Sequence, residues 1–180
     1  MTIAISETLI RTLIEARPIL TGDSSETDLR VRPRDLPAPA FLSDVSDCEG
    51  HVSTDYWQNE DAMYIHPPVQ NAVCSVLRGI EIGNLYNLSA AVHAFRQDGP
   101  VLSLAIGIAP VGVANASNWQ DFMGASRHVL PGRWAVVSKT ITSDLIGKHC
   151  DVLLSAQVME HQGNHNAWAL FRRFGFKCKE

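Results

Sequence analysis

The sequence has few cysteines, no long apolar run and no excess of positive charge. Its four cysteines lack the paired spacing of a zinc clamp: Cys48, Cys74, Cys150 and Cys178. No stretch reaches the ~20 apolar residues of a membrane-spanning helix. Glu7 and Glu15 interrupt the segment 1–20, where a signal peptide would be continuously apolar. We therefore expect no disulfide framework, no metal, no membrane partner and a cytoplasmic location.

The charge balance argues against a generally basic protein. Lys and Arg number 15 and Asp and Glu number 19, which gives a formal net charge of -4. We therefore expect no nucleic-acid partner. The hydrophobic fraction of 46% over 180 residues suits one core. We expect a single domain over 1–180, with an N-terminal helix and irregular extension over 1–62 and the core over 63–180.

The first 62 residues carry weak structural signals. Ser6 is a suitable N-cap, and the apolar residues after it recur at helical spacing until Pro18, which predicts a short amphipathic helix. The polar, proline-rich segment 22–39 predicts a long connection or an edge strand, with a brief strand over 29–31. The acidic segment 44–61 has little periodicity and predicts a surface loop.

The middle of the chain has clearer patterns. Pro67 and Pro68 precede apolar residues at helical spacing from Val69 to Ile80, which predicts a helix. The Asp98-Gly99 pair separates apolar runs over 90–95 and 101–108, which predicts a β-hairpin. The second run is almost entirely apolar, as in a central strand that is covered on both faces.

The last third admits more than one interpretation. The segment 126–131 predicts a short strand that ends at a proline, and 151–158 predicts a buried strand. The segment 134–146 fits a helix by spacing and a strand by its β-branched and aromatic residues. The segment 166–174 predicts a helix that Gly175 ends.

One pattern in this third has the form Asn-x-x-Ala-x-x-Leu-Phe-x-x-x-Gly-Phe: Asn164, Ala167, Leu170, Phe171, Gly175 and Phe176. Ser126-Arg127-x-Val129-x-Pro131 precedes it. Together these residues resemble the acyl-CoA-binding half of the GNAT superfamily of N-acyltransferases, over about residues 88–180. The resemblance implies an α+β fold, with a mixed, mostly antiparallel sheet flanked by helices.

The resemblance also implies a function: transfer of an acyl group from acetyl-CoA or another acyl-CoA to a small-molecule or protein amine. The implied cofactor-binding residues are Val129, Arg133, Ser138, Lys139, Asn164 and Phe171. Because the loop keeps only Gly132, Arg133 and Lys139 would supply much of the phosphate binding. Phe171 stands where relatives often have a tyrosine acid, so His128 and His161 are the catalytic candidates. A homodimer is left open.

Other interpretations stay open. The segments 152–161 and 167–174 also fit a hairpin, with 134–142 as a third strand and 67–80 as a helix packed across the sheet, as in a hot-dog-fold acyl-thioester enzyme. A GNAT-like fold without catalysis would serve as a binding or interaction protein. His161 and His165 lack a third metal ligand at fixed spacing. The aromatic residues are interpreted as core or pocket wall, because basic residues are not interleaved with them.

Overall fold

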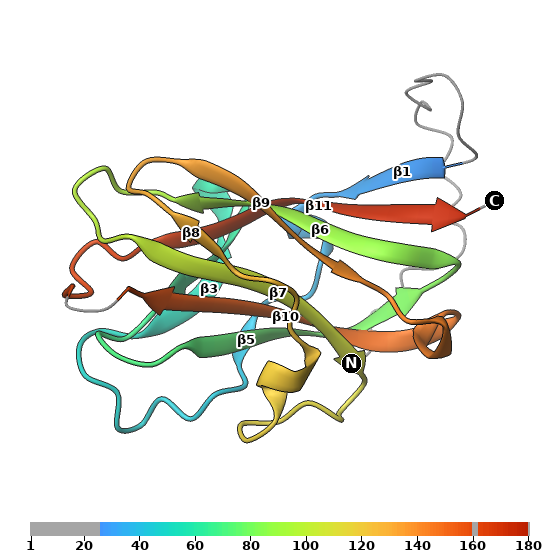
Figure 1. Ribbon diagram of the computed structural model, residues 1–180, viewed down its shortest axis with the longest axis horizontal. Helices are drawn as coiled ribbons and strands as arrows, with labels where there is room; N and C mark the ends of the chain where they lie inside the picture. Colours follow the sequence, from blue (N-terminus) through green and yellow to red (C-terminus); the bar gives the residue numbers. More distant parts are fainter. Residues whose placement is uncertain (1–25, 160–161, 180) are drawn as a thin grey trace.

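A computed structural model describes residues 26–159 and 162–179, and the described residues form two antiparallel sheets packed face to face (Figure 1). The strands are β1 (Glu26–Val31), β2 (Ala40–Phe41), β3 (Ser53–Trp57), β4 (Ala62–His66), β5 (Val73–Ile82), β6 (Leu85–Ala94), β7 (Leu102–Pro110), β8 (Arg127–Val129), β9 (Trp134–Thr140), β10 (Lys148–Val158) and β11 (Ala169–Lys179). Four short 3-10 turns join them: η1 (Pro33–Asp35), η2 (Gln58–Glu60), η3 (Trp119–Phe122) and η4 (Ser143–Leu145).

The two sheets differ in strand number and order. The six-stranded sheet runs β3-β4-β11-β6-β9, and β1 also pairs with β11. The five-stranded sheet runs β2-β5-β10-β7-β8. All of these pairings are antiparallel. Strands that follow one another in the chain often lie in different sheets, so the architecture is a β-sandwich.

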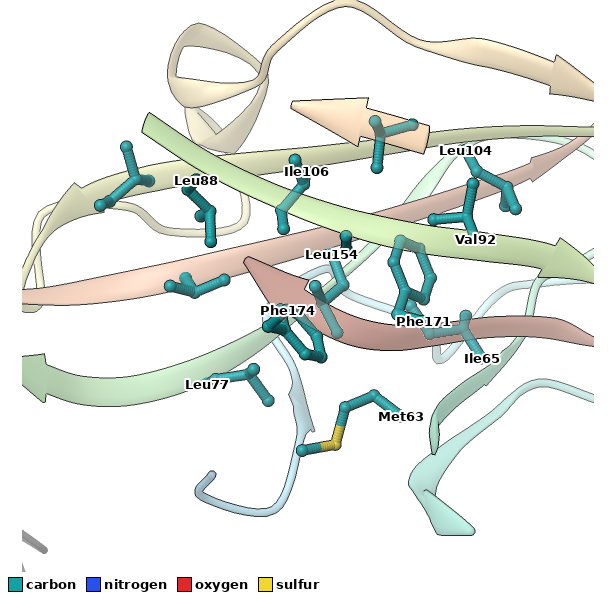
Figure 2. Close-up of a cluster of buried hydrophobic side chains, with 14 of the residues drawn as sticks. Met63, Ile65, Leu77, Leu88, Val92, Leu104, Ile106, Leu154, Phe171 and Phe174 are labelled. Carbon is teal, nitrogen blue, oxygen red and sulfur yellow. The ribbon is translucent and has the colours of Figure 1, made fainter. Parts of the chain in front are cut away.

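The core lies between the inner faces of the two sheets. Alternate residues of β6 point into it, and Leu88 and Val92 are fully buried. Phe171 and Phe174 of β11 meet Leu154 of the opposite sheet in the same cluster (Figure 2). Burial of each such side chain contributes about 1.5–3 kcal/mol, so this interior is the main source of the fold's stability.

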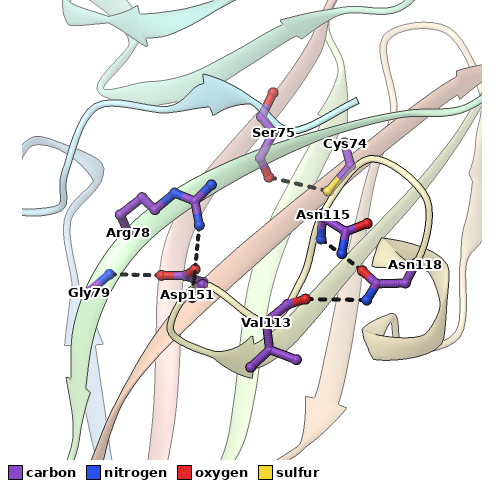
Figure 3. Close-up of polar contacts among 9 residues, drawn as sticks. Cys74, Ser75, Arg78, Gly79, Val113, Asn115, Asn118 and Asp151 are labelled. Carbon is purple, nitrogen blue, oxygen red and sulfur yellow. Dashed lines mark hydrogen bonds and ion pairs between the residues drawn. The ribbon is translucent and has the colours of Figure 1, made fainter. Parts of the chain in front are cut away.

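The outer face of the five-stranded sheet is also covered. The segment 111–124 lies on it and buries Trp119 against Cys74, Val76 and Leu153, in a second apolar cluster. The centre of this sheet is therefore buried on both faces. Figure 3 shows a polar contact beside this segment, where the buried Asp151 carboxylate meets Arg78 and Gly79 of β5.

These observations correct the predicted fold class. Among the described residues no α-helix occurs, so the α+β fold of the GNAT resemblance is wrong. The predicted helix over 67–80 is wrong, because 73–82 forms β5. Its residues 73–77 are buried in succession on both faces of the sheet, and all of them except Ser75 are apolar, so apolar residues at helical spacing occur there without a helix. The predicted helix over 6–18 lies outside the described residues.

The two predicted hairpins are also wrong. Strands β6 and β7 belong to different sheets, with β6 between β11 and β9 and β7 between β10 and β8. Strands β10 and β11 likewise lie in different sheets, so the hot-dog-like alternative fails, and no helix crosses a sheet in the described residues. The segment 134–140 is a strand, β9, as the β-branched and aromatic residues there favoured. Strands were predicted correctly over most of β7, β8 and β10.

Candidate binding face

Within residues 26–159 and 162–179, the outer face of the six-stranded sheet carries aromatic side chains and no covering segment. Cross-strand register places Tyr64, Leu170, His93 and Trp134 side by side on β4, β11, β6 and β9, with Asp55 of β3 at the end of the row. On β6, His93 alternates with buried Val92 and Ala94, so its ring lies on the face away from the core. Trp134 and Val136 of β9 are 50% and 64% exposed.

Six rings on this side form a continuous array, which we call the aromatic face: Trp57, Tyr64, His93, Phe95, Trp134 and Trp168. The Trp57 ring meets Phe95 and Trp168 edge-on, at centroid distances of 5.3 and 5.4 Å. His93 stacks on Trp134 at 4.0 Å, and its edge meets Phe95 at 5.5 Å. The rings therefore run without interruption across the sheet from β3 to β9.

Two arginines lie over the aromatic face, and each has an acidic partner. The Arg96 guanidinium lies 5.3 Å from the Trp168 ring centroid, and its Nε is 3.2 Å from Asp98 Oδ1. The Arg172 guanidinium lies 5.2 Å from the Trp134 centroid and donates to the Glu60 carboxylate. These cation–π contacts hold the rings in place, and the carboxylates balance the two positive charges.

A pocket of about 340 Å³ opens at the β3 end of the aromatic face. Its walls combine rings with hydrogen-bonding groups: Trp57, Tyr64, Trp168, Ser53, Thr54 and Asp55. Burial raises the pKa of the Tyr64 hydroxyl, so this group remains a hydrogen-bond donor at neutral pH. The pocket thus offers flat apolar walls together with a donor and a carboxylate acceptor.

His93 joins the two halves of the array. Burial lowers its pKa below the ordinary value, and the nearby Arg172 guanidinium lowers it further, so the ring is neutral at pH 7. Its Nδ1 and the Nε of Arg172 are buried and have no hydrogen-bond partner within the described structure. A neutral imidazole that stacks on Trp134 extends the apolar surface without adding charge to it.

The residues predicted to form a coenzyme A site lie in three different places. Val129, Arg133, Ser138 and Lys139 belong to β8, β9 and the turn between them, and the Lys139 ammonium donates to the Met123 carbonyl at 2.9 Å. His128 is exposed on β8.

The other predicted residues do not belong to this β8–β9 segment. Asn164 donates to the carbonyls of His51 and Pro67, at 2.9 and 3.2 Å, and so fastens a loop. The Phe171 ring is fully buried in the core. His161 lies outside the described residues. Among the described residues no group of three or more His, Cys, Asp and Glu side chains is placed to hold a metal ion.

Sequence reasoning did not find the aromatic face. Trp57, Trp134 and Trp168 were interpreted as core or pocket wall. Trp57 and Trp168 do line the β3 pocket, but the array that they form with Trp134 on the outer sheet face was not predicted. The sequence separates them by more than 30 residues, and only strand pairing brings them together. The alternation Trp134, Val136, Ser138 along β9 was a usable signal, because it is the outward set of an edge strand.

Comparison with known proteins places the chain in a family. A family model described as "Family of unknown function (DUF6212)" matches residues 12–157. The chain belongs to this family. A search of curated proteins finds no match.

The first of three similar solved structures supports the fold. The K3 cleaved adhesin domain of Lys-gingipain from Porphyromonas gingivalis W83 is 12% identical, with a TM-score of 0.52 over 85% of this chain and 99% of that one. The xylan-binding module CBM86 from Roseburia intestinalis is 10% identical, with a TM-score of 0.47 over 83% of this chain and 94% of that one. The CsCBM6-3 structure from Clostridium stercorarium, in complex with cellobiose, is 12% identical, with a TM-score of 0.41 over 89% and 100%.

The fold overturns the predicted acyl transfer. The motif helix that was to form one side of the coenzyme A site is the strand β11 of a sandwich, and its Phe171 faces the core. Acyl transfer to an amine is therefore wrong as a function for this chain, and the non-catalytic GNAT-like and hot-dog-fold alternatives fail with it. Coenzyme A as a ligand and a homodimer stay predictions. No helix of the described segments is long and apolar enough to cross a membrane.

Proposed function

We propose that this protein binds carbohydrate on the aromatic face. The single observation that carries the proposal is the unbroken array of six rings across the open sheet. A pyranose ring has faces of C–H groups and a rim of hydroxyls, so its faces pack on aromatic rings and its rim needs hydrogen-bond partners. Asp55 lies beside the rings and supplies an acceptor, and the hydroxyl of Tyr64 supplies a donor.

Charge favours sugar over single-stranded nucleic acid as the stacking partner. Proteins that stack bases combine aromatic rings with free cations that follow the phosphate backbone. On the aromatic face, Arg96 and Arg172 are both matched by carboxylates, of Asp98 and Glu60, and the whole chain carries a net charge of -4.

The proposal is tested by titration calorimetry with a panel of plant, algal and bacterial oligosaccharides. Trp134→Ala and Trp168→Ala should each weaken binding of a bound oligosaccharide by about tenfold, because each removes one stacking surface. Leu130→Ala is the matched control, since Leu130 is 60% exposed and lies off the aromatic face. Binding that is equally strong in both tryptophan variants would refute the aromatic face as the site.

A further inference from the structure

A second, charged pocket adjoins the aromatic face. It has a volume of about 220 Å³ and lies where the end of β1, the β3–β4 turn and β11 meet. Three arginines line it, Arg32, Arg172 and Arg173, together with Glu60 and Asp61. Arg172 also lies over the Trp134 ring, so the pocket and the aromatic face share this side chain.

The backbone of β11 is distorted in a way that brings two of these arginines together. Successive residues of a regular strand point to opposite faces of the sheet. The β6–β11 register shifts between Arg172 and Gly175, and Arg173 has a φ of +48° in this irregularity. A left-handed backbone is unfavourable for a residue other than glycine, and irregularities of this kind redirect side chains. The result here is that consecutive arginines line a single pocket.

The acidic groups of the pocket already have partners. Glu60 accepts from Arg172. The Asp61 carboxylate accepts from the Arg34 backbone N–H at 3.2 Å and from the Tyr56 hydroxyl at 3.0 Å.

Arg32 and Arg173 make no ion pair with any residue of the described chain. Two guanidinium groups are thus available to an incoming anion, and a guanidinium binds carboxylate and sulfate oxygens with paired N–H donors.

We propose that this arginine pocket binds a negatively charged substituent, a carboxylate or a sulfate ester, on a sugar that stacks on Trp134. The inference rests on the proposed carbohydrate binding and gives it a ligand class, the acidic glycans. Arg172 joins the two sites, because its guanidinium lies over the Trp134 ring and the same residue lines the pocket. The carboxylates of Glu60 and Asp61 reduce the attraction of the pocket for anions in general. Tight binding therefore needs both the stacked sugar ring and its negatively charged substituent.

The test is binding to an array of neutral, uronic-acid-containing and sulfated oligosaccharides at low ionic strength, followed by calorimetry on the bound glycans. We expect the acidic glycans to bind about tenfold or more tighter than neutral glycans of the same length, since each charged hydrogen bond contributes about that factor. The uronate and sulfate arms identify which anion the pocket takes. Raised salt should reduce the preference.

The variant is Arg32→Gln with Arg173→Asn, in which asparagine keeps the left-handed backbone at low cost. It should abolish the preference for acidic glycans and leave the affinity for neutral ones unchanged, while the control Arg127→Ala on β8 should behave as the unaltered protein. Arg32→Gln alone is a second test variant, because it removes one guanidinium and leaves the irregularity in β11 unchanged. If only neutral glycans bind, or if the preference for acidic glycans survives in the double variant, the arginine pocket is not an anion site. The aromatic face would still be supported as the carbohydrate site. Absence of binding to every glycan would overturn both.

Discussion

At the residue scale, one buried carboxylate fastens the loop after β7 to the five-stranded sheet. Asp151 has no exposed side-chain surface. It accepts from Arg78 Nη1 at 2.7 Å and from the backbone N–H groups of Gly79 and Gly112, each at 3.0 Å. The register between β10 and β5 shifts beside it, between Cys150 and Val152, so the carboxylate satisfies backbone groups that regular pairing leaves free.

Replacement of Asp151 by alanine should therefore lower the free energy of unfolding by about 2–3 kcal/mol. Two backbone donors would lose their acceptor, and a buried donor without a partner costs about 1–3 kcal/mol. Arg78 is half exposed, so water would solvate its charge and limit the loss. Urea unfolding measures the change, with Asp47→Ala as the control at an exposed position. Equal stability of the two variants would contradict this role.

At the scale of elements, the segment 119–124 connects the two sheets along one edge of the sandwich. Gly124 donates its N–H to the Ile106 carbonyl of β7 at 2.8 Å, and Lys139 of β9 donates to the Met123 carbonyl. A Cβ at Gly124 would lie 2.4 Å from the backbone carbonyl oxygen of Ser138 on β9. Only glycine allows this approach, so the position of β9, and of Trp134 on it, depends on Gly124.

Gly124→Ala should destabilise the protein by about 1–3 kcal/mol, because backbone must shift to admit the methyl group. It should also weaken glycan binding, since β9 carries Trp134. The matched control is Gly83→Ala, where a Cβ would meet nothing within 4 Å. Thermal unfolding and the same calorimetric titration measure both effects. Equal stability of the Gly124→Ala and Gly83→Ala variants would contradict this role, because segment 119–124 would then shift without loss of stability.

The elements also show what the sequence could predict. The strands β7 and β10 were readable, because their apolar residues are continuous and bounded by turn residues. Strand β11 could not be predicted in the same way. Leu170, Phe171 and Phe174 have the sequence spacing of a helix face, and the register shift in β11 accommodates that spacing in a strand. That spacing produced both the predicted helix and the GNAT resemblance. The aromatic face as a whole could not be predicted for another reason. The alternation along β9 indicates one outward row, but the other rings come from separate strands, and one sequence does not show which distant strands pair.

At the scale of the whole molecule, the two outer faces of the sandwich are unequal. The segment 111–124 covers the five-stranded sheet and buries Trp119 there. The six-stranded sheet leaves Trp134 half exposed on its outer face, on the edge strand β9. An exposed apolar patch on a folded chain is typical of a binding site, so this asymmetry supports the aromatic face as the site proposed for glycans.

The width of that face predicts how binding depends on ligand length. From β3 to β9 the aromatic face crosses four strand spacings of about 4.8 Å, or roughly 19 Å. One sugar ring covers only one or two of the six aromatic rings, so a monosaccharide should bind weakly. Affinity should rise with each added unit until the oligosaccharide spans the sheet and then remain constant. Calorimetry over a length series of one bound glycan measures this, and Trp57→Ala should shorten the length at which affinity stops rising, because Trp57 lies at the β3 end. An affinity that is independent of length would place binding in the β3 pocket alone, and the face between His93 and Trp134 would then have no part in it.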